Sequence, residues 1–186
     1  MSYRRSPLSC AGGGEGKVIA WRNPVQSESG DRVTRLRSCA LRLESLYRVR
    51  FTYSGGWGAD LAGPDNPECQ FFFLAEGRCE GRVSGQFRGA NHPHRRSDGT
   101  FLPDFQGVIE TDDGAEVLFD YRGYGRAYPV GRRQIVASAM HLSEDERYRW
   151  LNDSLSVGVG EVRPQEGEPT ELVIEWAELV WEPIAE

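Results

Sequence analysis

The sequence predicts an all-β protein, a single antiparallel β-barrel of lipocalin-like architecture with one short helix. Apolar and polar residues alternate with a period of two over much of the chain, and turn residues separate these runs. Helical periodicity is almost absent. Many short strands with almost no helix indicate a closed barrel or a sandwich, and glycines inside the strands favour the strong coiling of a small barrel.

The N-terminal part of the chain lacks this alternation. Residues 1–37 are rich in Gly, Ser and Arg, and only residues 18–21 form a short apolar segment. We therefore predict a flexible tail over residues 1–37 and a barrel domain over residues 38–183. A tail that caps the barrel, anchored by Trp21, is the alternative.

The strand predictions follow the alternation in chain order. Successive side chains of a strand point to opposite faces, so each run has one apolar face. The alternating runs are residues 47–53, 79–87, 115–121 and 154–159, and three further apolar runs are residues 70–74, 135–140 and 172–176. Turn residues occupy 63–67, 89–93, 112–114 and 166–169, and Asp113-Gly114 is a strong hairpin signal.

One segment predicts a helix. Ser143 is placed to cap it, acidic residues follow at 144–146, and residues 148–151 supply an apolar side. Because such a helix buries one face, Trp150 is predicted to plug the core. Trp176 and Trp181 are expected to pack within or against the last strand, and Trp57 to close the barrel mouth from a loop.

Charge and cysteine spacing exclude several classes. The net charge of -6 argues against a nucleic-acid partner. No run approaches the ~20 apolar residues of a membrane helix, so no membrane partner is expected. The four cysteines form no CxxC pair, and neither a phosphate loop nor a dinucleotide fingerprint is present, so no cofactor is predicted. We expect a cytoplasmic protein with reduced thiols.

Asp104 is the candidate general base. A carboxylate that faces a barrel interior loses water and gains proton affinity, which suits it to move a proton. An outward-facing, solvated aspartate at a strand start is the alternative. A nearby guanidinium is then expected to stabilise a substrate enolate or carboxylate, and the candidates are Arg88, Arg96 and Arg122.

Residues 120–126 form an aromatic and basic cluster. Tyr121, Arg122 and Tyr124 suit an aromatic acid, through stacking and a bidentate ion pair, although a strand end with tyrosines at the rim fits equally. Separately, His92 and His94 flank one residue, as the metal ligands of cupins do. Asp98, Asp104 or His141 would complete that metal site, and a solvated polar loop is the alternative.

Three motifs carry a family resemblance: Arg-Ser-Asp-Gly at 96–99, Thr-Asp-Asp-Gly at 111–114, and the helical turn and strand at 148–160. With these, the chain resembles the family called domain of unknown function 3237 over roughly residues 41–181. The resemblance implies a small antiparallel barrel and names no reaction. This chain departs from the family pattern at Asn91 and His92, which replace an acidic residue and a tryptophan, and at residues 105–106.

The sequence therefore predicts a barrel that binds a hydrophobic or aromatic small molecule. We expect a cofactor-independent isomerase, cyclase or lyase, with Asp104, Arg96 and His92 as catalytic residues. The ligand would meet Arg88, Asn91, Tyr121, Arg122, Tyr124 and Trp57. A non-catalytic carrier and a cupin-like metal enzyme using His92 and His94 are the alternatives, and a homodimer stays open.

Overall fold

A computed structural model of the chain describes residues 41–61, 68–127, 133–165 and 168–183. The predicted tail over residues 1–37 and the predicted turn at 63–67 lie outside this part of the chain, as does the centre of the turn at 166–169. No helix among the described residues is long and apolar enough to cross a bilayer.

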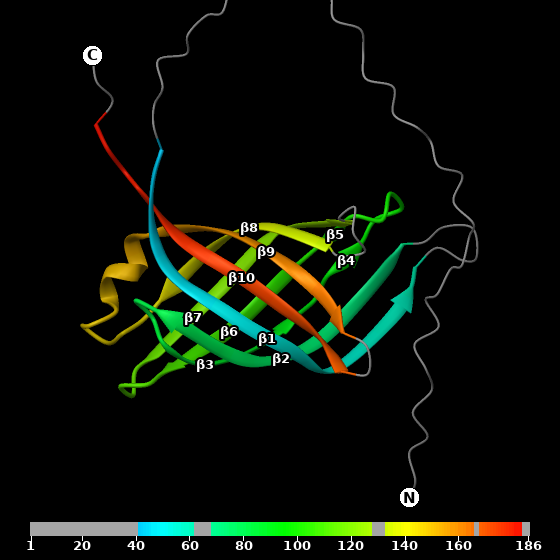
Figure 1. The fold of residues 1–186 in the computed structure, drawn as a ribbon, viewed down its shortest axis with the longest axis horizontal. Helices are drawn as coiled ribbons and strands as arrows, with labels where there is room; N and C mark the ends of the chain where they lie inside the picture. Colours follow the sequence, from blue (N-terminus) through cyan, green and yellow to red (C-terminus); the bar gives the residue numbers. More distant parts are fainter. Residues whose placement is uncertain (1–40, 62–67, 128–132, 166–167, 184–186) are drawn as a thin grey trace, which may run out of the picture. The chain divides into compact units, whose positions relative to one another are not determined.

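The described residues form a closed antiparallel barrel (Figure 1). Eight strands pair in the ring β1–β10–β9–β8–β7–β6–β3–β2, and β2 returns to β1. The short strands β4 and β5 pair with each other and lie between β2 and β7 at one end. The strand bounds are β1 (Arg42–Asp60), β2 (Cys69–Gly81), β3 (Gly85–Asn91), β4 (His94–Arg95), β5 (Phe101–Leu102), β6 (Asp104–Thr111), β7 (Glu116–Ala127), β8 (Arg133–Leu142), β9 (Leu155–Gln165) and β10 (Glu168–Val180).

The structure confirms most of the predicted strands and corrects one. The run at residues 79–87 is not one strand, because a turn at residues 82–84 separates β2 from β3. The backbone N–H of Arg82 donates to the carbonyl of Leu46 at 2.7 Å, which fixes this turn against β1. Val83 is fully buried although it lies in the turn. The apolar–polar alternation therefore continues through the turn, and the turn cannot be recognised from the sequence pattern.

A predicted turn is also wrong. Residues 89–91 continue β3 and pair with both β2 and β6. Glycine is needed at position 89 because a Cβ there would lie 2.4 Å from the ring of Phe105. The hairpin at residues 112–114 is confirmed: Thr111 and Ala115 close it, and Gly114 has φ of 86°.

The predicted helix is shorter and begins later. It is the 3₁₀ helix η1 (Arg149–Asp153), and no side chain caps it. The Ser143 hydroxyl instead donates to the carbonyl of Glu116, which ties the β8–η1 connection to β7. Leu151 is the buried plug, whereas Trp150 is only half-buried beneath the guanidinium of Arg82.

The other tryptophans divide between core and surface. Trp176 is buried on β10, as predicted. Trp181 is 81% exposed beyond β10, so its predicted packing is wrong. Trp57 is a residue of β1 rather than of a loop, and its ring packs against Phe72 on the outside of the barrel. Its outward direction removes it from the mouth.

The core fills only one end of the barrel. Leu46, Val83 and Leu151 are buried where β1 and β9 begin and β2 ends. Next to them the rings of Phe87, Phe105 and Phe119 pack together, with centroids 5.0–5.4 Å apart. These side chains close the end that carries η1. The opposite end, where β8 begins and β7 ends, holds a cavity.

Candidate functional site

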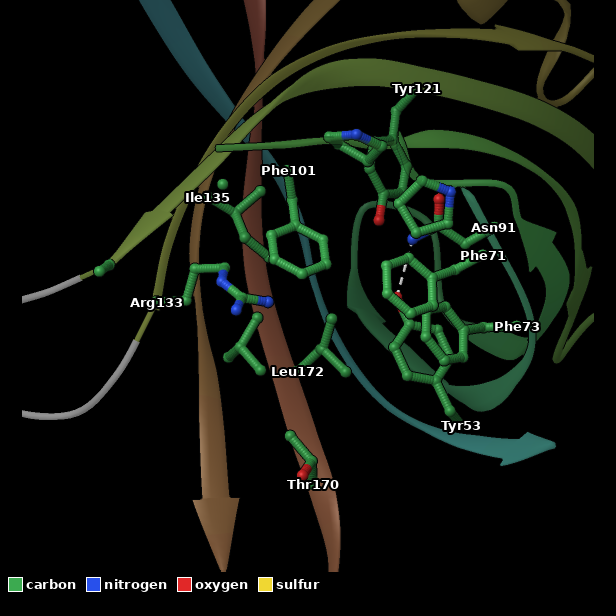
Figure 2. Close-up of a pocket in the computed structure, with 15 residues that line it drawn as sticks. Tyr53, Phe71, Phe73, Asn91, Phe101, Tyr121, Arg133, Ile135, Thr170 and Leu172 are labelled. Atoms are coloured by element: carbon green, nitrogen blue, oxygen red, sulfur yellow. Dashed lines mark hydrogen bonds between the residues drawn. The ribbon is translucent and has the colours of Figure 1, made fainter. Parts of the chain in front are cut away.

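The cavity lies inside the barrel at the end opposite η1 and has a volume of about 580 Å³ (Figure 2). A volume of this size matches a small organic ligand. Residues from most strands of the ring line it: Tyr53, Phe71, Phe73, Asn91, Pro93, Phe101, Pro103, Tyr121, Gly125, Ala127, Arg133, Ile135, Val162, Thr170 and Leu172.

Aromatic rings form one wall of the cavity. Tyr53 stacks on Phe73 with centroids 4.6 Å apart, and Phe73 stacks on Phe71 at 5.5 Å. Phe71 in turn stacks on Phe101 at 5.8 Å. These rings come from β1, β2 and β5, and alternation turns them inward. A row of nearly parallel rings favours a flat, apolar ligand.

A buried amide holds the hydroxyl of Tyr53. The Nδ2 of Asn91 donates to that hydroxyl oxygen at 2.8 Å, and the Oδ1 of Asn91 accepts the backbone N–H of Asp104 at 3.2 Å. The backbone bond settles which end of the amide faces Tyr53. Because the Tyr53 oxygen accepts from Asn91, its own proton is left to be donated to a ligand.

Burial keeps the Tyr53 phenol protonated. It raises the pKa of Tyr53 to about 12, and this outweighs the opposing effects of the Asn91 hydrogen bond and the Arg133 charge. At neutral pH the group is therefore a hydrogen-bond donor, not a phenolate. Its proton can stabilise negative charge that develops on a ligand oxygen.

Arg133 is the only charged side chain among the described residues that line the cavity. Its guanidinium carbon lies 3.7 Å from the centroid of Phe101, so the cation rests on the aromatic wall. Burial lowers the pKa of Arg133, the Tyr53 phenol opposes this, and the charge of Arg95 adds to it. A guanidinium stays protonated at neutral pH despite such a shift. The cavity therefore has one fixed positive charge.

Tyr121 separates the cavity from the filled core. Its ring stacks on Phe105 with centroids 4.9 Å apart and also contacts Trp176 at 5.5 Å. Burial raises the pKa of Tyr121 well above its usual value, and the phenols of Tyr53 and Tyr47 add to this. Tyr121 and Asn91 are the two residues of the predicted site that the structure brings together at the cavity.

Of the two orientations that the sequence left open for Asp104, the structure shows the outward, solvated one, so the interior orientation that a role as general base required is wrong. Asn91 pairs with Phe105, and both are buried, so the neighbouring Asp104 points outward. Its carboxylate is 45% exposed and accepts from Nε of Arg122 at 3.2 Å, across the β6–β7 pair. Asp104 contributes to the cavity through its backbone N–H alone, because strand parity sends its side chain to solvent.

The other predicted binding residues also lie outside the cavity. Arg88 pairs with Glu110 on the outer face, and Arg96 pairs with Asp98 in the turn between β4 and β5. Tyr124, beside the outward-facing Arg122, is 36% exposed. The 120–126 cluster is therefore split by alternation. Tyr121 is the only aromatic or charged member that points inward. Arg122 pairs with Asp104 on the outer face, and the guanidinium of Arg126 lies over the ring of Tyr124.

The histidines of the metal hypothesis lie in different surroundings, and His94 is a half-buried residue of β4. His92 packs its ring against Phe72 with centroids 4.8 Å apart, on the outside of the barrel. His141 is buried in the core, where its Nε2 lies 2.7 Å from the Tyr47 hydroxyl. Among the described residues no three His, Cys, Asp or Glu side chains gather in a way that would hold a metal. The cupin-like alternative therefore has no ligand set in this part of the chain.

Sequence reasoning missed Tyr53 and Arg133 as site residues. Tyr53 ends an alternating run whose inward members, Val49 and Phe51, are apolar, so the pattern marks it only as part of the apolar face. Arg133 was not singled out. It has the same parity as Ile135 and Ala137, which face the interior. A charged residue in register with an inward apolar row is the signal that would have found it.

Together, the fold and the cavity define a closed β-barrel with a ligand-sized, aromatic-walled interior. The family model described as protein of unknown function (DUF3237) matches residues 42–178. The chain therefore belongs to this family, as its motifs predicted. A comparison with curated proteins finds no match.

Solved structures of similar shape come from bacteria and a fungus. A β-barrel-like protein from Acinetobacter baumannii has a TM-score of 0.65 and 18% identity, over 75% of this chain and 96% of the other. A conserved protein of unknown function from Rhodopseudomonas palustris has a TM-score of 0.62 and 18% identity, over 75% and 98%. A protein described as an enzyme from Penicillium herquei has a TM-score of 0.55 and 24% identity, over 82% and 100%. These likenesses establish the barrel fold.

Proposed function

We propose that this protein binds a flat, mostly apolar small molecule that carries an acidic or carbonyl oxygen, and that it converts this ligand without a cofactor, as an isomerase, cyclase or lyase. The observation that carries the proposal is one constellation: the Tyr53 hydroxyl held by Asn91, and the Arg133 guanidinium, on the same aromatic-walled cavity. The rings take the flat body of the ligand, and the two donors take its oxygen.

The two donors define the chemistry that the proposal allows. A hydroxyl and a guanidinium that are already in place stabilise an enolate or phenolate oxygen as its charge grows. The described residues that line the cavity include no carboxylate and no imidazole. Proton removal then falls to water or to a group of the substrate, so Tyr53 and Arg133 replace Asp104, Arg96 and His92 as the proposed working residues. The walls of the cavity contribute to catalysis by holding the substrate in a reactive conformation.

A non-catalytic carrier is the second candidate. The lack of a general base among the described lining residues favours it, because binding alone needs only the rings and the two donors. The Penicillium neighbour is described as an enzyme, but at 24% identity it shares the fold alone. Turnover therefore decides between the two candidates.

Binding is tested first by native mass spectrometry of the freshly purified protein, with metal analysis on the same sample. We expect a co-purified or added planar phenol or aromatic acid to bind, and neutral analogues without the oxygen to bind more weakly. Arg133→Met should weaken binding of the acid by about tenfold or more, since charge-assisted hydrogen bonds are among the stronger ones. Arg88→Met, which changes an arginine on the outer face, should leave the affinity unchanged. If Arg133→Met and Arg88→Met bind the acid with equal affinity, the ligand does not bind next to Arg133 in the cavity.

Catalysis is tested on the ligands that bind. Each is incubated with the wild-type protein and with Tyr53→Phe, and products are followed by mass and chromatography. Turnover that Tyr53→Phe reduces more than it reduces binding supports the enzyme. Tight binding with unchanged ligand across the whole panel supports the carrier, and a stoichiometric metal in the purified protein would overturn the cofactor-independent mechanism.

A further inference from the structure

Tyr121 is the last large inward side chain of β7 before the cavity. It follows Val117 and Phe119 on the inward face of the strand, and the next two inward positions are Gly123 and Gly125. Since successive side chains of a strand lie on opposite faces, these glycines leave the interior beside this stretch of β7 free of side chains. The cavity begins where the ring of Tyr121 ends, and Tyr121 and Gly125 both line it.

Packing holds the ring of Tyr121 in a fixed direction. The residue is 1% exposed, stacks on Phe105 with centroids 4.9 Å apart, and contacts Trp176 at 5.5 Å. Because Asn91 pairs with Phe105, and Phe105 with Tyr121, these residues form one row across β3, β6 and β7. Figure 2 shows the hydroxyl of Tyr121 directed into the cavity, toward Asn91 and Tyr53. It therefore reaches the same inner end of the cavity as the hydrogen bond between those two side chains.

The hydroxyl of Tyr121 has no hydrogen-bond partner among the described residues. Tyr47 and Tyr53 also face the interior, and each has a partner: Nε2 of His141 for Tyr47, and Nδ2 of Asn91 for Tyr53. Buried polar groups are nearly always hydrogen-bonded, and a tyrosine hydroxyl that is buried usually finds a partner. The free hydroxyl of Tyr121 therefore needs an explanation.

Its position beside the cavity supplies one. Three other buried polar atoms lack a partner in the described part of the chain: Nδ1 of His141, Oγ of Ser156 and Nε1 of Trp176. None of these three residues lines the cavity, whereas Tyr121 does. A ligand in the cavity can therefore give the Tyr121 hydroxyl the acceptor that the described protein groups do not provide.

Three neutral groups at the inner end of the cavity offer protons. Burial raises the pKa of Tyr53 and the pKa of Tyr121, so both hydroxyls are protonated at neutral pH. The Nδ2 of Asn91 carries two protons, and the oxygen of Tyr53 takes one of them. The described lining residues include no carboxylate that would compete for these protons. The inner end therefore favours an oxygen atom that carries negative charge.

We propose that the hydroxyls of Tyr121 and Tyr53, together with the amide of Asn91, form an oxyanion site at the inner end of the cavity. The proposal rests on the proposed function and adds Tyr121 to it as a catalytic residue, because its hydroxyl touches the reacting oxygen. It narrows the ligand to a phenol or an enolisable carbonyl compound, whose oxygen becomes negative when a proton leaves. Phenols that packing already holds in place stabilise this charge without reorganisation.

The test uses two flat probes that differ in one oxygen. The first is a nitronaphthol with its nitro group para to the hydroxyl, because its anion absorbs at a longer wavelength than its neutral form. The second is nitronaphthalene, which has the same rings and no hydroxyl. Equilibrium dialysis against the full-length chain gives both affinities, and absorbance gives the pKa of the bound nitronaphthol. We expect the wild-type protein to prefer the nitronaphthol and to lower its pKa below the value in water.

Tyr121→Phe removes the hydroxyl and keeps the ring that packs on Phe105. It should weaken binding of the nitronaphthol anion by about tenfold, because hydrogen bonds to charged groups are among the stronger ones. The pKa of the bound nitronaphthol should then rise by about one pH unit, since the anion loses more affinity than the neutral form. The affinity for nitronaphthalene should stay the same. Tyr124→Phe makes the same change on the outer face of β7 and should alter none of these values.

Thermal unfolding shows whether each variant is folded. If Tyr121→Phe is not, the wild-type protein decides, because a bound nitronaphthol whose pKa is no lower than in water overturns the oxyanion site. Equal loss of both probes in Tyr121→Phe also overturns it, since the loss would then come from a change of shape. If Tyr53→Phe weakens the nitronaphthol and Tyr121→Phe changes neither affinity nor absorbance, Tyr121 is no donor, while the proposed function stands. A wild-type protein that binds neither probe contradicts the proposed function as well.

Discussion

Tyr47 and Tyr53 lie on the same inward face of β1, yet they belong to different environments. Tyr47 lies in the filled end, where its hydroxyl is 2.7 Å from Nε2 of the buried His141. Tyr53 lines the cavity, and Asn91 holds its hydroxyl oxygen while its proton remains available. The comparison shows that burial of a phenol does not by itself make a site. What separates the two is space beside the hydroxyl.

The largest expected contrast between the two ends concerns their aromatic rings. Phe105 is fully buried and contacts the rings of Phe87, Phe119 and Tyr121, so Phe105→Ala should lower the free energy of unfolding by about 3–5 kcal/mol. Phe101, at the cavity, is only half-buried, and Phe101→Ala should cost about 1 kcal/mol while it weakens ligand binding. Urea unfolding measures both. Equal losses would mean that the cavity end is packed as tightly as the core.

The next effect is a pH dependence located in the filled end. Burial lowers the pKa of His141 to about 4, from an unfolded value of about 6.5. The unfolded chain therefore binds this proton first as the pH falls. The contribution to stability is complete above about pH 6.5, is lost progressively down to about pH 4, and amounts to about 3 kcal/mol.

Unfolding free energies measured between pH 7.5 and pH 4 test this dependence. The double variant Tyr47→Phe with His141→Leu removes both partners of the hydrogen bond, so it should fold and lose most of this slope. His94→Gln, at a half-exposed histidine of β4, should keep it. A double variant with the wild-type slope would assign the dependence to other groups.

The smallest expected effect compares the two hydroxyls directly. Tyr47→Phe leaves the Nε2 of His141 buried without a partner, and Nδ1 already has none among the described residues, so a loss of about 1–3 kcal/mol is expected. Tyr53→Phe frees an amide of Asn91 that can reach water in the cavity, so the loss should be under about 1 kcal/mol. Ligand affinity should show the reverse: Tyr53→Phe should decrease it by about tenfold, whereas Tyr47→Phe should leave it unchanged. Thermal unfolding with and without ligand separates the two responses.

Alternation in the sequence predicted the strands wherever one face is core and the other is water. In β7, Val117, Phe119 and Tyr121 are buried as their spacing requires. The same logic misled at residues 79–87, because Val83 is buried from a turn and keeps the period going. It also placed Ser143 as a helix cap, whereas its hydroxyl bonds a carbonyl on another strand. Local patterns cannot register contacts that come from distant segments.

The candidate site was predicted less well than the fold. Asn91 stood out because it departs from the family pattern, and Tyr121 because it is an aromatic residue beside arginines. Asp104 and its neighbours were chosen for their chemistry alone. The sequence pattern alone does not decide which face of a strand a carboxylate or guanidinium occupies. The pairing of the buried residues Asn91 and Phe105 places the neighbouring Asp104 on the solvent face.

The sequence by itself determined that the chain forms an antiparallel barrel, where most strands run, and the sharp turn at Gly114, because period-two patterning and turn residues act over a few neighbouring positions. Only the tertiary structure decided which residues share the cavity. Tyr53, Asn91 and Arg133 come from β1, β3 and β8, and closure of the ring brings them together. The unequal filling of the two ends depends on the summed volume of side chains from all strands. It left space beside Tyr53, which is partly buried, and none beside the buried Tyr47.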